Sequence, residues 1–104
     1  MIKHVTQETF KQEVIDSKLP VLVDFWATWC GPCRMQGQLL DSLDKQLDTS
    51  KAILAKVNVD EQQELAMQFG VMSIPTLIVF KNGKVAAKEV GVRNEEQIKQ
   101  MLGL

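Results

Sequence analysis

Runs of apolar residues alternate with amphipathic stretches along the chain. Residues 20–27 (PVLVDFWA) are almost continuously apolar, which is typical of a strand covered on both faces in a parallel sheet. After Pro32, leucines at positions 39, 40, 43 and 47 recur at helical spacing and give a helix one apolar face. The same patterns predict strands over residues 2–5, 52–59, 76–80 and 84–90, and helices over residues 9–17, 61–69 and 94–102.

Cap and turn residues mark the ends of several of these elements. Thr9 and Gln12 fit a capping box at the start of the first helix, and Asn94 is suited to cap the last one. Gly70 provides a stop for the helix before it, because glycine readily takes the left-handed conformation that ends helices. Residues 81–83 (KNG) predict a turn, so the last two strands form an antiparallel hairpin.

The order of these elements, βαβαβαββα, predicts an α/β fold. Strands that alternate with helices imply a central, mostly parallel sheet flanked by helices, here with an antiparallel edge hairpin. We expect residues 1–104 to form a single domain, because a chain of this length supports one core. In open sheets of this kind, functional sites gather at the carboxyl ends of strands.

Composition and charge exclude several classes of protein. The chain has 12 Lys and Arg against 13 Asp and Glu, a net charge of -1, so nothing suggests a nucleic-acid or membrane-surface protein. No apolar stretch approaches the roughly 20 residues that span a bilayer, and the first residues lack the apolar core of a signal peptide. We therefore expect a cytoplasmic monomer, in a compartment that disfavours permanent structural disulfides.

The two cysteines of the chain, Cys30 and Cys33, lie in the motif WCGPC at positions 29–33. A structural zinc site needs four ligands, and the only further histidine or cysteine is His4, in a predicted strand, so we expect no metal. A c-type haem would require histidine after the second cysteine, where the chain has Arg34. A purely structural disulfide would gain little, because so short a loop removes little entropy from the unfolded chain.

Redox chemistry fits this motif better. At the start of a helix, free N–H groups and the helix dipole favour negative charge, so we expect Cys30 to be exposed and stabilised as a thiolate. Cys33 would lie one turn further, more shielded, and would resolve the mixed disulfide that Cys30 forms with a substrate. Pro32 suits the first turn, Gly31 would allow a tight backbone turn, and Trp29 offers a flat apolar surface.

Longer stretches of the chain resemble the thioredoxin family: VDFWATWCGPCRM, AKVNVD, SIPTLIVFKNG and VAAKEVG, in the family's order. The resemblance implies the thioredoxin fold, a redox-active Cys30–Cys33 disulfide and a general protein-disulfide reductase. Such a protein acts on many disulfide-containing proteins, maintains cytosolic thiols and donates electrons to reductive enzymes. It binds no cofactor, and a flavoprotein, thioredoxin reductase, recharges it from NADPH. Two alternatives stay open: a disulfide oxidase or isomerase, and a non-catalytic module that binds partners through the same groove.

Two charged residues interrupt the predicted core strands. Asp24 is the single charge in its strand, and burial of a lone carboxyl raises its pKa. Lys56 is the corresponding exception in its own strand. From the pattern alone, Asp24 could be a solvated residue at a strand end and Lys56 an edge lysine whose stem packs on apolar surface. The resemblance instead implies that Asp24 accepts a proton from Cys33, through water, and that Lys56 pairs with Asp24.

The resemblance also implies a groove for substrates. Pro75 could be an ordinary proline at the start of a strand, but the family implies a cis Ile74–Pro75 bond that faces the disulfide. The backbone of Ile74 would then pair with an extended substrate, and Val90 and Gly91 would form the other side.

One short segment departs from the family. At residues 36–38 (QGQ) the family usually has an apolar residue, a small residue and a proline that bends the helix. We expect the bend to persist without that proline. Phe25, Trp26, Met35 and the leucine face are expected in the core.

Overall fold

The structure is a computed structural model that describes residues 2–104. Its elements follow the predicted order βαβαβαββα. The strands are β1 (Lys3–His4), β2 (Val21–Trp26), β3 (Ile53–Asn58), β4 (Thr76–Lys81) and β5 (Lys84–Val90), and the helical segments are η1 (Lys11–Ile15), α1 (Gly31–Gln46), α2 (Gln63–Gln68) and α3 (Glu95–Leu102).

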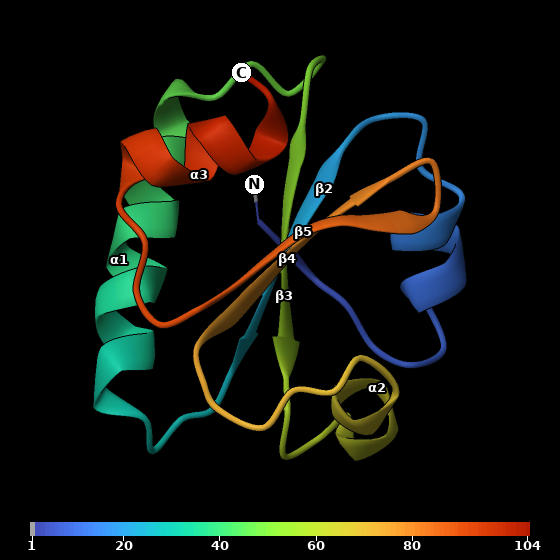
Figure 1. Ribbon diagram of the computed structural model, residues 1–104, viewed down its shortest axis with the longest axis vertical. Helices are drawn as coiled ribbons and strands as arrows, with labels where there is room; N and C mark the ends of the chain where they lie inside the picture. Colours follow the sequence, from blue (N-terminus) through green and yellow to red (C-terminus); the bar gives the residue numbers. More distant parts are fainter. Residues whose placement is uncertain (1) are drawn as a thin grey trace.

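The five strands form one mixed sheet in the order β1-β3-β2-β4-β5. β3 is parallel to both β1 and β2, whereas β4 is antiparallel to both β2 and β5. Antiparallel pairing thus extends one strand further into the sheet than the predicted hairpin. The segment between β3 and β4, which includes α2, stays at the carboxyl end of β3 (Figure 1), so β4 starts at that end and runs back antiparallel to β2.

Helices cover both faces of the sheet, which explains the continuously apolar β2. α1 and α3 lie on one face, and η1 and α2 lie on the other (Figure 1). Side chains alternate along a strand, so Val21, Val23 and Phe25 join the core beneath η1 and α2, while Leu22 joins the core beneath α1 and α3. Asp24 therefore points towards the α1 face.

Two local predictions are wrong. Thr9 and Gln12 form no capping box: the Thr9 hydroxyl oxygen instead accepts from the Thr6 N–H at 3.0 Å, and η1 begins after Phe10. Phe10 is buried, with its ring 5.2 Å from that of Phe69 between centroids, so tertiary packing places this segment. Met35 is 59% exposed rather than in the core, because it lies on the solvent side of α1.

Other end signals are confirmed. Gly70 follows α2 with a φ of 64°, and the turn at Asn82 and Gly83 has positive φ at both positions, as a two-residue hairpin loop requires. Asn94 caps α3 in a capping box with Gln97, in which each side chain accepts a hydrogen bond from the other residue's backbone N–H.

Candidate functional site

A disulfide joins Cys30 and Cys33 where β2 leads into α1. Cys30 is the N-cap residue of α1, and its Sγ accepts a hydrogen bond from the Cys33 N–H at 3.2 Å. Both residues are mostly covered, Cys30 to 5% exposure and Cys33 to 3%, so the expected difference in exposure is small in this disulfide form. What distinguishes Cys30 is its position at the helix end, where backbone N–H groups stabilise negative charge.

The two residues between the cysteines lie in the first turn of α1. Pro32 has the predicted position, where its missing N–H is harmless. The interpretation of Gly31 as a tight-turn residue is wrong, since it is the first residue of a regular helix and its φ is not positive. A Cβ atom at position 31 would have nothing within 4 Å. The site is therefore open to solvent at Gly31.

Trp29 lies on the surface beside the disulfide, with 67% of the residue exposed. Its indole N–H donates to Asp60 Oδ2 at 2.9 Å, which fixes the ring orientation. Asp60 follows β3, so two neighbouring parallel strands, β2 and β3, each contribute a residue at their carboxyl ends. The WCGPC motif is a reason to select Trp29 from the sequence, whereas no sequence pattern points to Asp60.

The other side of the site is the loop before β4. The Ile74–Pro75 peptide bond is cis, as the resemblance implied, and the Ile74 carbonyl oxygen lies 3.8 Å from Cys30 Sγ. The Gly91 N–H donates to the Pro75 carbonyl oxygen at 2.8 Å, so the end of β5 adjoins the loop. The structure thus brings together the disulfide, Ile74, Pro75, Val90 and Gly91, as predicted.

Asp24 is fully buried beneath the site, with neither carboxyl oxygen hydrogen-bonded to any part of residues 2–104. Burial raises the pKa of Asp24 from 3.8 to about 7, and the positive charge of Lys56 acts in the opposite direction and more weakly. Near neutral pH, Asp24 therefore exists in both protonated and ionised forms. A carboxyl group in that condition can accept or release a proton.

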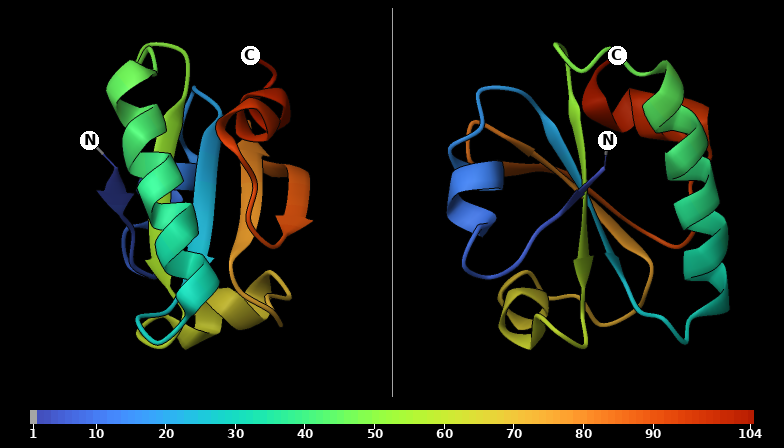
Figure 2. Two further views of the ribbon diagram at one scale, coloured as in Figure 1. Left: turned by 90° about the vertical axis from the view of Figure 1, so that its left-hand side faces the viewer. Right: turned by 180° about the vertical axis from the view of Figure 1, so that it is seen from behind.

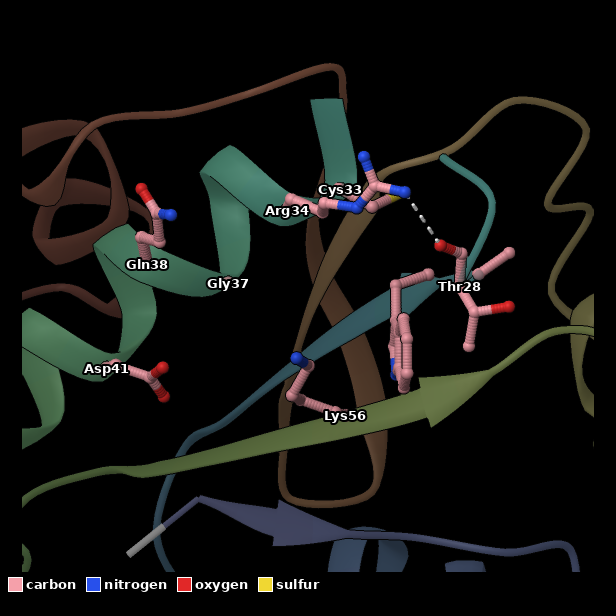
Figure 3. Close-up of a pocket in the computed structure, with 9 residues that line it drawn as sticks. Thr28, Cys33, Arg34, Gly37, Gln38, Asp41 and Lys56 are labelled. Carbon is pink, nitrogen blue, oxygen red and sulfur yellow. Dashed lines mark hydrogen bonds between the residues drawn. The ribbon is translucent and has the colours of Figure 1, made fainter. Parts of the chain in front are cut away.

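Lys56 is the register partner of Asp24 on β3. Its ammonium lies 4.5 Å from the centre of the Trp26 ring and packs on that aromatic face. Because the Asp24 carboxyl oxygens have no hydrogen-bond partner in the described part of the chain, Lys56 acts on Asp24 through its charge. Lys56 and Cys33 line a common pocket of about 320 Å³. Figure 3 shows the Lys56 amine pointing towards α1 across this space, and Arg34 reaching the Thr28 carbonyl at the rim, at 3.4 Å.

Gln36 is a second polar residue of the site region that sequence reasoning missed. It is fully buried, and its side chain bonds the backbone of Arg93. The sequence does contain a signal for Gln36, because residues 36–38 depart from the family and place an amide where an apolar residue is usual. Its partner Arg93, however, lies 57 residues away, and no local pattern indicates that contact.

Within residues 2–104, no group of three or more His, Cys, Asp and Glu is placed to hold a metal ion. Over the same range, no helix has the length and apolar character needed to cross a membrane.

Comparisons with known proteins agree with this geometry. The Thioredoxin family model matches residues 1–103. The chain is 49% identical over 98 residues to Thioredoxin 1 of Nostoc sp., covering 94% of this chain and 91% of that protein. It is 51% identical over 87 residues to Thioredoxin 1 of Synechococcus elongatus (84% and 80% covered) and 42% identical over 98 residues to Thioredoxin of Rickettsia felis (94% and 92% covered). The family match covers nearly the whole chain, including the Cys30–Cys33 pair and the cis bond before β4, and the chain therefore belongs to the thioredoxin family.

Proposed function

We propose that this protein is a general protein-disulfide reductase that works by dithiol–disulfide exchange through Cys30 and Cys33. The observation that carries the proposal is the hydrogen bond from the Cys33 N–H to Cys30 Sγ at the open start of α1. This contact stabilises negative charge on the sulfur that would attack, beside the Ile74–Pro75 loop and the end of β5.

The reaction has two exchange steps. In the dithiol form, the Cys30 thiolate attacks one sulfur of the substrate disulfide, which forms a Cys30–substrate bond and releases the other sulfur as a thiolate. Cys33 then attacks Cys30 Sγ, which forms the Cys30–Cys33 disulfide and releases the second substrate thiolate. Two electrons have passed to the substrate, and solvent protons convert its thiolates to thiols.

Asp24 would supply the proton acceptor for the second step. Cys33 must lose its proton before it attacks, and the pKa of Asp24, about 7, suits that transfer at neutral pH. Asp24 has no direct hydrogen bond to Cys33 among the described residues, so a water molecule would carry the proton. Lys56 would tune the acceptor by its charge.

Substrates would bind as extended chains along the groove. The backbone of Ile74 and the end of β5 at Val90 and Gly91 would pair with the substrate main chain, and Trp29 would cover the disulfide from the other side. Main-chain pairing is independent of side chains, which suits a reductase of many proteins.

The oxidised pair must be reduced again after each turnover. We propose that a flavoprotein, thioredoxin reductase, does so with electrons from NADPH. A reducing compartment such as the cytoplasm suits this cycle.

The test is reduction of insulin disulfides, coupled to NADPH oxidation by a flavoprotein thioredoxin reductase. We expect turnover by the wild type and none by Cys30→Ser or Cys33→Ser. Cys33→Ser should accumulate mixed disulfides on Cys30, whereas Cys30→Ser should not. Partner binding that survives replacement of both cysteines, without wild-type turnover, would favour the non-catalytic module. A reduction potential above about −200 mV would favour an oxidase or isomerase.

A further inference from the structure

Gln36 is a buried amide in the helix that carries the redox pair. It lies three residues after Cys33, and its neighbours on the buried face of α1 are Gly37, Leu40 and Leu43. A buried amide is costly unless its polar atoms are hydrogen-bonded. Gln36 meets this requirement with one partner: its Oε1 accepts from the Arg93 N–H at 2.7 Å, and its Nε2 donates to the Arg93 carbonyl oxygen at 3.0 Å.

Arg93 belongs to the segment that would border the proposed substrate groove. Two residues earlier, Gly91 donates its N–H to Pro75, and Val90 is in register with Thr76 on β4. The segment 90–93 is therefore held at one end by the cis-proline loop and at the other by Gln36. These bonds join all three parts of the site: the redox helix, the Ile74–Pro75 loop and the end of β5.

The side chain of Arg93 makes its contacts elsewhere. Its guanidinium donates to Glu89 Oε2 at 3.0 Å and to the Val92 carbonyl at 3.1 Å, both within β5 and the residues after it. Within residues 2–104, the hydrogen bonds described between α1 and segment 90–93 are the two made by Gln36. The connection between helix and segment thus depends on one side chain and the main chain of one residue.

We propose that Gln36 is a positioning residue, which holds segment 90–93 against α1 and so fixes the width of the substrate groove. The inference rests on the proposed function, because it concerns how substrates reach Cys30. Gln36 touches neither sulfur, so its loss should weaken docking of an extended protein substrate. It should leave exchange with a disulfide too small to occupy the groove unchanged.

The test replaces the amide by an apolar side chain of similar length, Gln36→Met. This change leaves the N–H and carbonyl of Arg93 without their partner. With insulin we expect KM to rise at least about fivefold, the effect of losing one of the two neutral hydrogen bonds, while kcat stays within about twofold. With hydroxyethyl disulfide the rate should not change.

A matched control separates positioning from general destabilisation. Val14→Ala removes buried methyl groups beneath η1, on the opposite face of the sheet from α1. It should lower stability without changing KM for insulin. Amide hydrogen exchange gives a readout independent of activity: the Gly91 and Arg93 amides should exchange faster in Gln36→Met than in the wild type, and not in Val14→Ala at equal stability.

In the rate assays, either of two results would overturn the proposal: an unchanged KM for insulin in Gln36→Met, or an equal loss of rate with insulin and with hydroxyethyl disulfide. Failure of the proposed function has a different signature, since the wild type would then reduce neither disulfide. Unchanged exchange of the Gly91 and Arg93 amides would refute the positioning role even in that case.

Discussion

At the scale of single residues, the buried carboxyl of Asp24 has the clearest chemical consequence. Its side chain has no hydrogen-bond partner within residues 2–104, and burial raises its pKa to about 7. A group with that pKa can exchange protons at neutral pH, while an amide of the same shape cannot.

Asp24→Asn should therefore slow the step in which Cys33 resolves the mixed disulfide. We expect the rate of this step to fall about tenfold or more at pH 7.5. This loss is smaller than the largest rate effects of general bases that contact the reacting group directly, because a water molecule lies between Asp24 and Cys33 in the proposed mechanism. Single-turnover release of reduced substrate measures this step. Asp48→Asn makes the same chemical change on an exposed loop and should not alter the rate. Identical rates for Asp24→Asn and wild type from pH 6 to 9 would exclude Asp24 as the acceptor.

The residues of the site differ in how far the sequence reveals them. Cys30, Cys33 and Pro75 lie in short motifs, and Asp24 interrupts an apolar strand, so each could be found locally. Asp60 and Arg93 could not, because their contacts with Trp29 and Gln36 span 31 and 57 residues. Only the folded sheet, which brings the ends of β2, β3 and β5 to one edge, defines those contacts.

At the scale of elements, local sequence signals predicted which helices and strands occur, but they did not always predict where an element begins or in which direction a strand pairs. Asn94 caps α3 as its pattern predicts, because the cap is exposed and only local contacts act on it. The equivalent signal at Thr9 failed, since burial of Phe10 and Val14 determines where η1 begins. No pattern within β4 indicates its direction either, because that direction depends on where the chain between β3 and β4 runs.

Gly37, in the interior of α1, gives a test at this scale. Glycine in a helix interior costs roughly 1 kcal/mol relative to alanine. A Cβ atom at position 37 would meet the Lys56 amine at 3.4 Å, an ordinary contact with the end of a flexible side chain. Gly37→Ala should therefore raise the free energy of unfolding by up to about 1 kcal/mol, as measured by urea denaturation. A lower stability would mean that Lys56 cannot move aside.

At the scale of the whole molecule, Asp24 links folding to pH. Its pKa is about 7 in the folded protein against 3.8 ordinarily, so between these values the folded chain retains a proton that the unfolded chain has lost. Stability from this group is complete below pH 3.8 and is lost as pH rises to about 7.

We expect the wild type to lose up to about 4 kcal/mol of unfolding free energy from this group between pH 4 and pH 8, at 1.36 kcal/mol per pKa unit. Asp24→Asn removes the titrating group and should remove this loss, so the variant should be the more stable protein at pH 8. Urea denaturation of both oxidised proteins at the two pH values measures the difference. Parallel pH dependences would show that Asp24 does not titrate differently on folding.

Different elements lie at the two ends of the long axis of the molecule. The start of α1 and the loop before β4 lie at one end, while α3 and the C-terminus lie at the other (Figure 1 and Figure 2). A linker attached at the C-terminus would therefore leave the disulfide and its groove facing away from a support. The protein could be immobilised through that end on a bead or an electrode, with its redox chemistry directed towards the solution.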